Sequence, residues 1–252
     1  MIKSKKLNRY KNIRHAFFNK LGGNSKGIYK SLNCGPGSSD KKKDIQKNLK
    51  TVLKKIKSVS KKIILLNQIH SNKFYYINKK SMLKKKFNGD ALITNQKNIP
   101  IGVLTADCVP ILIYDKNISM IAAIHAGWKG AYKDIVKNVI EFMLKKGCTS
   151  KNMTAVIGPC ISSKNYEVKN DFINKFINKD KKNEIFFKKI KNKTYFSLNK
   201  YIYYELKKLN VRNIDIINKD TFDIKNNFFS ARRSISRNEN DYGRNISIIM
   251  IN

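Results

Sequence analysis

The sequence predicts a protein of the α/β class, on two observations. Short apolar runs, long enough for a buried strand and too short for an ordinary helix, recur along the 252 residues. Between several of these runs lie longer segments whose apolar side chains repeat at the spacing of a helix face. The length suffices to bury one large core, and no Pro/Gly/Ser-rich linker or internal repeat divides the chain. We therefore expect one domain that spans residues 1–252.

The strands are predicted from apolar runs bounded by polar or turn residues. In chain order they are Ile63–Leu66, Phe74–Ile77, Ala91–Thr94, Ile101–Leu104, Val109–Tyr114, Met120–Ile124, Thr154–Ile157, Ile214–Ile217 and Ile246–Ile251. A further apolar run, Ile13–Phe18, contains His15, which we interpret as a packed histidine away from the functional site.

Helices are predicted where apolar residues repeat every three or four positions. The segments are Asp44–Ile56, Tyr132–Lys146 with Gly147 as its stop, and a helix capped by Ser197. Their apolar faces are Ile45, Leu49, Val52 and Ile56; Ile135, Val139 and Phe142; and Leu198, Ile202, Leu206 and Leu209. The lysine- and asparagine-rich residues 171–195 predict a helix followed by an irregular excursion.

One cysteine and two of the three histidines stand where predicted strands begin or end. Cys108 lies two residues before Pro110, which cannot donate to a sheet in mid-strand, so we expect a bend that turns the thiol into a cleft. His125 follows the run Met120–Ile124, and His70 follows a similar run upstream. Cysteine and histidine are preferred ligands of zinc and copper, and three protein ligands with an open fourth position are typical of a catalytic zinc site. The alternative is that Cys108 is a small buried side chain with no ligand.

These residues belong to a series of short motifs that together resemble one known family. The motifs are Leu21-Gly22-Gly23-Asn24-Ser25-Lys26-Gly27 with Ser31-Leu32-Asn33, Gln68-Ile69-His70, Gly89-Asp90-Ala91, Thr105-Ala106-Asp107-Cys108-Val109-Pro110, His125-Ala126-Gly127-Trp128-Lys129-Gly130, Gly158-Pro159-Cys160-Ile161 with Tyr166-Glu167-Val168, and Phe228-Phe229-Ser230-Ala231-Arg232-Arg233 with Tyr242-Gly243-Arg244. In this order they cover nearly the whole chain, which makes them far more specific together than singly. The sequence resembles the YfiH family, also called the laccase-domain or "polyphenol oxidase" family.

The resemblance implies a YfiH-like layered sandwich with a mixed β-sheet core and flanking helices. It implies a zinc-dependent purine nucleoside phosphorylase, which converts adenosine, inosine or S-methyl-5′-thioadenosine and phosphate to the base and the (methylthio)ribose 1-phosphate, and which also deaminates adenosine. The implied metal ligands are His70, Cys108 and His125, with zinc expected and copper as the alternative. Zinc there would lower the pKa of a bound water for attack at the purine C6. The implied partners are small purine nucleosides and phosphate.

The same resemblance points to the residues that hold substrate. We take Lys20, Asn33, Arg232, Arg233 and Arg244 as candidates for substrate or phosphate binding. Lys20 stands where the family carries an arginine, which keeps the charge but loses the planar guanidinium fork. Only seven of the 53 basic residues are arginine, and most of them gather near the C-terminus. There they suit a phosphate or carboxylate, with structural ion pairs as the alternative.

Two aspartates are candidates for a role beside the metal. Asp107 precedes Cys108 between two apolar runs, where a carboxylate needs a partner, and we expect it to be catalytic as a proton carrier. Asp90 is either the carboxylate partner of a metal-bound histidine or a turn aspartate that satisfies its own backbone. Cys160 is interpreted as structural.

Three other functions stay open. A copper-dependent, laccase-like polyphenol oxidase needs copper redox chemistry, and three histidines are too few for a multicopper laccase. A cysteine or zinc amide hydrolase acting on cell-wall precursors would use Cys108 as nucleophile and His125 as base. A nucleic-acid-binding protein would use the formal charge of +36.

The positive charge is spread along the chain and is not gathered in one segment. Lys41–Lys43, Lys84–Lys86 and Lys188–Lys193 lie far apart, so we expect a solvated basic surface and no specific nucleic-acid partner. No apolar stretch approaches the about 20 residues of a membrane span, and the basic N-terminus lacks the apolar region of a signal peptide. The four cysteines form no CxxC pair. We expect a cytoplasmic protein without a membrane partner, as a monomer or homodimer.

Overall fold

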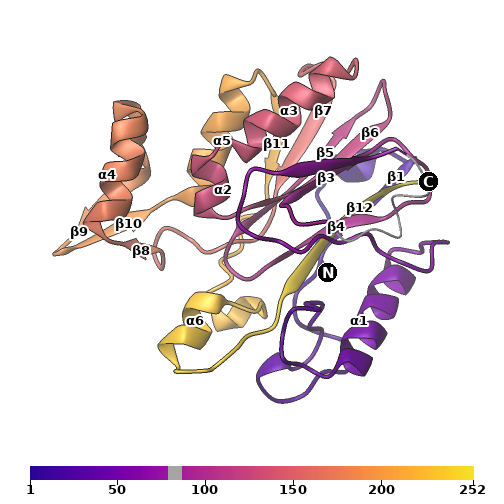
Figure 1. Ribbon diagram of the computed structural model, residues 1–252, viewed down its shortest axis with the longest axis horizontal. Coiled ribbons are helices and arrows are strands. Elements are labelled where there is room, and N and C mark those ends of the chain that lie inside the picture. Colours follow the sequence, from indigo (N-terminus) through magenta and orange to yellow (C-terminus); the bar gives the residue numbers. More distant parts are fainter. Residues whose placement is uncertain (79–86) are drawn as a thin grey trace.

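The computed structural model describes residues 1–78 and 87–252, so the predicted lysine run Lys84–Lys86 lies outside the described residues. Nine strands build the two sheets of the body (Figure 1). They are β1 (Ile13–Phe17), β2 (Phe74–Ile77), β3 (Ala91–Thr94), β4 (Ile101–Thr105), β5 (Val109–Asp115), β6 (Met120–Ala126), β7 (Met153–Ile157), β11 (Asn213–Ile216) and β12 (Asn245–Ile251).

The larger sheet has the strand order β11-β7-β5-β6-β3-β2, and the smaller has the order β1-β12-β4. The larger sheet is mixed: β2 pairs with β3 and β11 with β7 in parallel, whereas the inner neighbours are antiparallel. The predicted α/β sandwich with a mixed sheet is therefore confirmed. The strand predicted at Ile63–Leu66 is wrong. This segment is buried, but only Ile64 bridges to Ile101, and the chain leaves the sheet before a ladder forms.

Six α-helices surround the sheets, and none among the described residues is both long and apolar enough to cross a membrane. They are α1 (Lys42–Lys55), α2 (Trp128–Tyr132), α3 (Ile135–Lys145), α4 (Asn170–Lys179), α5 (Leu198–Lys208) and α6 (Ala231–Ser236). The helix predicted over Tyr132–Lys146 begins later than expected, because Asp134 has a left-handed backbone with φ of 64° that separates α2 from α3. Ser197 does precede α5, but its hydroxyl donates to the Asn199 side chain and caps no backbone N–H.

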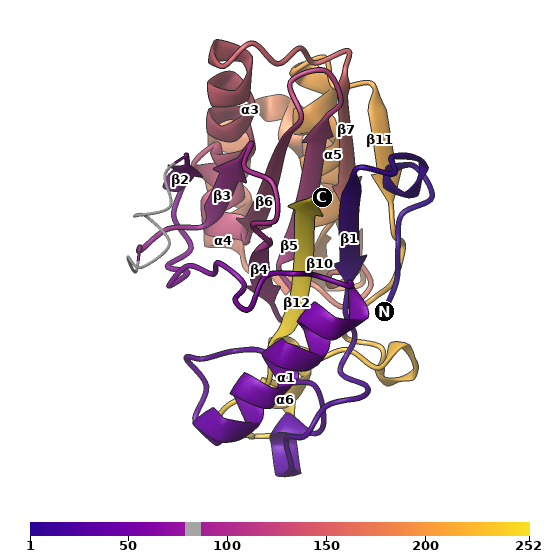
Figure 2. The same cartoon turned by 90° about the vertical axis from the view of Figure 1, so that its right-hand side faces the viewer.

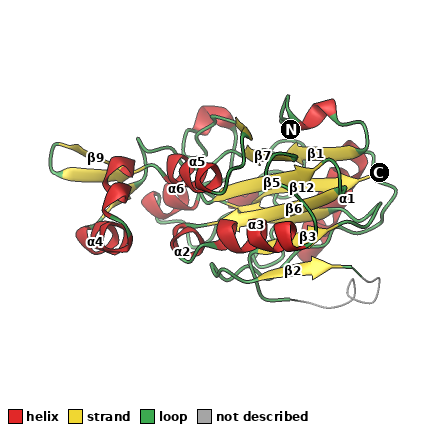
Figure 3. Ribbon diagram, turned by 90° about the horizontal axis from the view of Figure 1, so that it is seen from above, coloured by secondary structure: helices red, strands yellow, loops and turns green. Residues whose placement is uncertain are grey.

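Alternating side chains along the strands separate the core into layers. Ile111 and Ile113 of β5 pack toward α3 and α5, whereas Leu112 and Tyr114 face the smaller sheet. Figures 2 and 3 show α3 lying along the larger sheet, and Figures 1 and 2 show that α1 and α6 both lie below the sheets. Val52 of α1 packs against the other face of the smaller sheet.

A small third sheet projects beside α4, in the region where the sequence predicted an irregular excursion (Figure 1). Its strands are β8 (Glu167–Val168), β9 (Phe187–Ile190) and β10 (Lys193–Phe196), in the order β8-β10-β9. Phe176 of α4 lies 4.9 Å from both Phe172 and Phe196, measured between ring centroids. These aromatic contacts supply the core that the lysine-rich composition conceals.

Candidate metal centre

Three predicted ligands meet at one end of the larger sheet. One ligand atom from each of His70, Cys108 and His125 lies within 4.8 Å of the others. The Cys108 Sγ is 3.8 Å from the His70 Nε2, and the two imidazole rings meet edge to face at 4.8 Å between centroids. Within residues 1–78 and 87–252, no other three His, Cys, Asp or Glu side chains come together in this way.

The ends of several strands set the position of each ligand. Cys108 lies in the bend between β4 and β5, which belong to different sheets, and the preceding residue Asp107 has φ of 85°. The bend predicted before Pro110 is therefore confirmed. His125 is the β6 residue opposite Pro110 of β5. The His70 segment is tied to β4 because the Gln68 side chain exchanges two hydrogen bonds of 2.7 Å with the backbone of Leu104.

Gly127 lets the three ligands approach one another. A Cβ atom on this residue would lie 2.8 Å from the His70 Cδ2 and 2.9 Å from the Cys108 Sγ. Both distances are shorter than van der Waals contact, so any larger side chain would push the ligands apart. This explains why a glycine follows the strand that carries His125.

Asp90 fixes the positions of both histidines through hydrogen bonds. It is fully buried, and its carboxylate accepts hydrogen bonds from the His125 Nδ1 at 2.8 Å, the His70 N–H at 3.0 Å, and both the N–H and hydroxyl of Ser71. Burial opposes ionisation of Asp90, but the hydrogen bonds from His125 and Ser71 outweigh it and hold its pKa below the ordinary value. Of the two interpretations of Asp90, these contacts favour the carboxylate partner of a histidine, and metal binding by that histidine stays a prediction. Because Nδ1 faces Asp90, the Nε2 of His125 is left for a ligand.

The thiol and the imidazole change each other's protonation. Burial raises the pKa of Cys108, but His125 and His70 outweigh it and lower that pKa to about 6. Burial lowers the pKa of His125, and Cys108 with Asp90 raises it to about 9. A thiolate is therefore present at neutral pH, which is the form that binds metals. One thiolate and two imidazoles are consistent with a zinc or copper ion held by His70, Cys108 and His125.

Asp107 faces the start of α6. Its carboxylate accepts hydrogen bonds from the Thr221 hydroxyl at 2.7 Å, the Ser230 hydroxyl at 2.9 Å and the Arg232 N–H at 2.7 Å. Burial raises the pKa of Asp107, against the effect of these hydrogen bonds. The bend that carries Cys108 is thereby joined to α6. Thr221 lies outside the sequence motifs, and Ser230 lies within one but carried no sign of this contact, because both residues are more than a hundred positions from Asp107 in the chain.

Arg232 is connected to the metal ligands through its neighbours. Its guanidinium donates one hydrogen bond, of 3.2 Å, to the Glu167 carbonyl and stands 5.5 Å over the Tyr166 ring. Burial and the nearby Cys108 raise the pKa of Tyr166, which places this ring near the thiol. Of the predicted phosphate-binding residues, Arg232 is thus the one that the contacts link to the metal centre.

Three other predicted binding residues use their polar groups within the protein. Asn33 is fully buried, donates to Ser38 and Asp40 and accepts from the Arg244 N–H. The Arg244 guanidinium pairs with Asp241 at 2.8 Å. Arg233 donates to the carbonyls of Thr221, Phe222 and Phe228.

Lys20 lies on a different side of α6 from Arg232. Burial and the charges of Arg233 and Arg237 lower its pKa, which shows that these three cations lie near one another. Arg233 and Arg237 are four residues apart and share one helix face, whereas Arg232 lies a third of a turn away. The predicted binding residues therefore divide between two sides of α6.

Two residues interpreted as structural are placed accordingly. His15 is buried in β1 and accepts a hydrogen bond of 2.9 Å from the Ser4 N–H. Cys160 is buried, and burial raises its pKa, so its thiol stays protonated at neutral pH.

Comparisons with known proteins agree with this geometry. The family model described as "multi-copper polyphenol oxidoreductase laccase" matches residues 14–252. A purine nucleoside phosphorylase of Rickettsia conorii is 34% identical over 236 residues, which cover 93% of this chain and 94% of that protein. A purine nucleoside phosphorylase of Bacteroides thetaiotaomicron is 34% identical over 176 residues, or 67% of this chain and 65% of that protein.

Two solved structures share the fold. The crystal structure of Bacillus licheniformis hypothetical protein YfiH has a TM-score of 0.87 and 26% identity, and the match covers 95% of this chain and 93% of that one. The crystal structure of Neisseria meningitidis protein NMB0706 has a TM-score of 0.85 and 26% identity over 96% of each chain. The resemblance noted in the sequence motifs is thereby confirmed.

Proposed function

The chain belongs to the multi-copper polyphenol oxidoreductase laccase family, and we propose that it acts as a purine nucleoside phosphorylase with zinc held by His70, Cys108 and His125. The relatives named purine nucleoside phosphorylase support the reaction class. The observation that carries the proposal is the cluster of one thiolate and two oriented imidazoles. Its substrates in this proposal are phosphate with adenosine, inosine or S-methyl-5′-thioadenosine, and it also deaminates adenosine to inosine.

The residues around the ligands would bind and orient the substrates. When bound, zinc supplies Lewis-acid chemistry at the open side of the cluster. Arg232 uses one of its guanidinium N–H groups on Glu167, and no other acceptor for this side chain is found in the described part of the chain. The remaining N–H groups can donate two parallel hydrogen bonds to phosphate and hold it against the sugar C1′. Lys20 lies on the other side of α6 and remains a proposed phosphate contact apart from Arg232. Asn33, Arg233 and Arg244 use their hydrogen bonds to hold the loops near α6.

Asp107 is the proposed proton carrier for the departing base. Burial raises the pKa of Asp107, so its carboxyl group is protonated more easily than usual, which supports a role in proton transfer. Its hydrogen bonds to Thr221 and Ser230 give the proton a route through hydroxyl groups. They also give Asp107 a second role, in positioning Cys108 beside α6.

A chromatographic assay with adenosine tests the proposed reaction. Purified protein of known metal content is compared with the Cys108→Ala variant, and Cys148→Ala serves as the control because it removes a free thiol that lies outside the cluster. We expect adenine only when phosphate is present, inosine without it, and at least about a hundredfold loss of both in Cys108→Ala. Full activity of Cys108→Ala would overturn the site assignment.

A thiol hydrolase is a second candidate, favoured by the spatial arrangement of the Cys108, His125 and Asp90 side chains. Asp90 orients His125 at 2.8 Å, as a carboxylate orients the base of a nucleophilic cysteine. In this alternative Cys108 would attack an amide, such as one in a cell-wall precursor. A chelator separates the two candidates, because it leaves a thiol hydrolase active and abolishes a zinc-dependent phosphorylase.

A further inference from the structure

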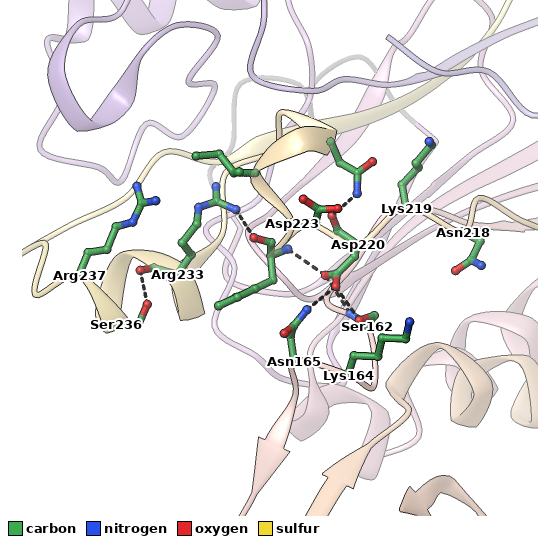
Figure 4. A pocket seen from close by; sticks show the side chains of 13 residues that line it. Ser162, Lys164, Asn165, Asn218, Lys219, Asp220, Asp223, Arg233, Ser236 and Arg237 are labelled. Atoms are coloured by element: carbon green, nitrogen blue, oxygen red, sulfur yellow. Dashed lines mark hydrogen bonds between the residues drawn. The ribbon is translucent and has the colours of Figure 1, made fainter. Parts of the chain in front are cut away.

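A pocket of about 760 Å³ lies beside α6, where Arg233, Ser236 and Arg237 form part of its wall (Figure 4). None of His70, Cys108 and His125 lines it. The turn at residues 220–222 stands between the two regions: Thr221 donates to Asp107 on the metal side, whereas its neighbours Asp220 and Phe222 line the pocket. The pocket is therefore adjacent to the metal centre but separate from it.

The inner wall of the pocket is held rigidly by Asp220. Its carboxylate accepts four hydrogen bonds, from the N–H and hydroxyl of Ser162, the side-chain amide of Asn165 and the N–H of Phe222. Arg233 fixes the same turn by donating to the carbonyls of Thr221 and Phe222 at 2.8 and 2.7 Å. Asp220 keeps its negative charge, but its oxygens are occupied by donors of the protein, which stabilise that charge within the wall.

Exposed basic side chains line the pocket around this wall. Lys164, Lys219 and Arg237 line the pocket with exposed side chains, for which no carboxylate or hydrogen-bond partner is found within residues 1–78 and 87–252. Figure 4 shows Arg237 beside Arg233 on α6 and the two lysines across the pocket. The remaining acid, Asp223, is exposed and accepts from the Lys225 N–H. The unpaired charge in the pocket is therefore mostly positive.

The pocket is also larger than a simple anion needs, and part of its lining is apolar. Phe222 and Ile224 contribute carbon surface, and Asn218 contributes an amide. Small-molecule sites typically combine a few polar anchors with such apolar surface in cavities of about this size. An aromatic ring on the wall offers a stacking face for a flat base.

We propose that this pocket binds a phosphate monoester carried by a sugar or nucleoside, with Arg237 as the main contact to the phosphate and Lys219, across the pocket, as a donor to the sugar or base. Inorganic phosphate alone fills only the charged part of the pocket. The proposal concerns binding alone and stands whether or not the metal centre is a phosphorylase.

Calorimetric titration of the full-length protein tests this directly, with AMP, ribose 5-phosphate, inorganic phosphate and adenosine as four separate probes. We expect AMP or ribose 5-phosphate to bind more tightly than inorganic phosphate and adenosine. The double variant Lys219→Gln/Arg237→Gln should weaken this binding at least about tenfold. The matched control Lys43→Gln/Lys47→Gln removes the same charge from the exposed face of α1 and should leave the affinity unchanged.

Two further variants identify the source of the phosphate and exclude the metal centre as the binding site. If the base stacks on the ring, Phe222→Leu should lower the affinity for AMP but not for ribose 5-phosphate. If the pocket contacts only the sugar and the phosphate, the variant should leave both affinities unchanged. Cys108→Ala should retain the binding in full. The proposal is overturned if binding disappears in Cys108→Ala, if the double variant binds as the control does, or if inorganic phosphate binds as tightly as both esters.

Discussion

The metal centre and the basic pocket lie on two sides of α6 and are built in opposite ways. The metal centre joins three side chains, two of them, Cys108 and His125, at strand ends, and buried Asp90 fixes the orientation of the histidines. The pocket instead surrounds one satisfied carboxylate, Asp220, with long exposed cations. The first arrangement fixes atoms for chemistry, whereas the second attracts charge and tolerates flexible side chains. A site for chemistry therefore depends on the fold in detail, and a charged pocket depends mainly on which cations are left unpaired.

Loss of the carboxylate behind the histidines should have the largest effect among changes that spare the ligands. Asp90→Asn removes a charged acceptor from His125, so metal affinity should fall about 10- to 100-fold. Asp115→Asn is the matched control, because Asp115 is also fully buried and accepts backbone N–H groups but lies away from the ligands. Competition with a chromophoric zinc chelator measures the metal affinity of both variants. Equal affinities in the two variants would mean that Asp90 is only structural.

A change at Asp107 tests the connection between the two regions. In Asp107→Asn the new amide can no longer accept from all three donors, so a buried N–H or hydroxyl loses its partner. The free energy of unfolding of the metal-stripped protein should fall by about 2 kcal/mol. Urea denaturation measures this, with exposed Asp223→Asn as the control. A stability equal to that of the control would show that Asp107 does not hold α6.

The pH dependence of stability should have a source outside both regions. Burial, with the charge of Lys3, lowers the pKa of His15 to about 4, against the effect of its hydrogen bond with Ser4. Below pH 6.5 the unfolded chain protonates this histidine while the folded protein does not, so stability is complete above pH 6.5 and is lost as the pH falls toward 4. Between pH 7 and 5.5 His15 should account for about 1 kcal/mol.

The His15→Gln variant provides the comparison for this prediction, because a glutamine carbonyl can still accept from the Ser4 N–H. Urea denaturation at the two pH values should give a smaller pH-dependent loss for the variant than for the wild type. The same loss in both proteins would place the pH sensitivity elsewhere, for example in the metal ligands.

The sequence predicted the metal centre better than the pocket, for physical reasons. Histidine is scarce in this chain, and His70, His125 and Cys108 stand next to apolar runs, so these residues could be picked out. Lysine is abundant everywhere, so Lys219 carried no signal. The partners of Asp107 could not be inferred either, because contacts between residues far apart in the chain depend on the tertiary fold.

The fold was likewise predicted only where the apolar pattern is clear. β2 and β3 have the predicted bounds, since their apolar runs end at polar residues on both sides. The hairpin of β9 and β10 was missed, because exposed lysines interrupt its apolar pattern. The break at Asp134 was missed as well, since a left-handed aspartate leaves no signature in hydrophobic periodicity.

Metal replacement tests the central claim most directly, namely that the cluster of His70, Cys108 and His125 is a metal site for nucleoside phosphorolysis. The protein is stripped with a chelator and reloaded with one equivalent of zinc or of copper. Adenine release from adenosine and phosphate is then measured beside oxygen consumption with a phenol. We predict that the stripped protein is inactive and that zinc restores adenine release without phenol oxidation. Full adenine release by the stripped protein, or phenol oxidation by the copper form without adenine release, would contradict the account.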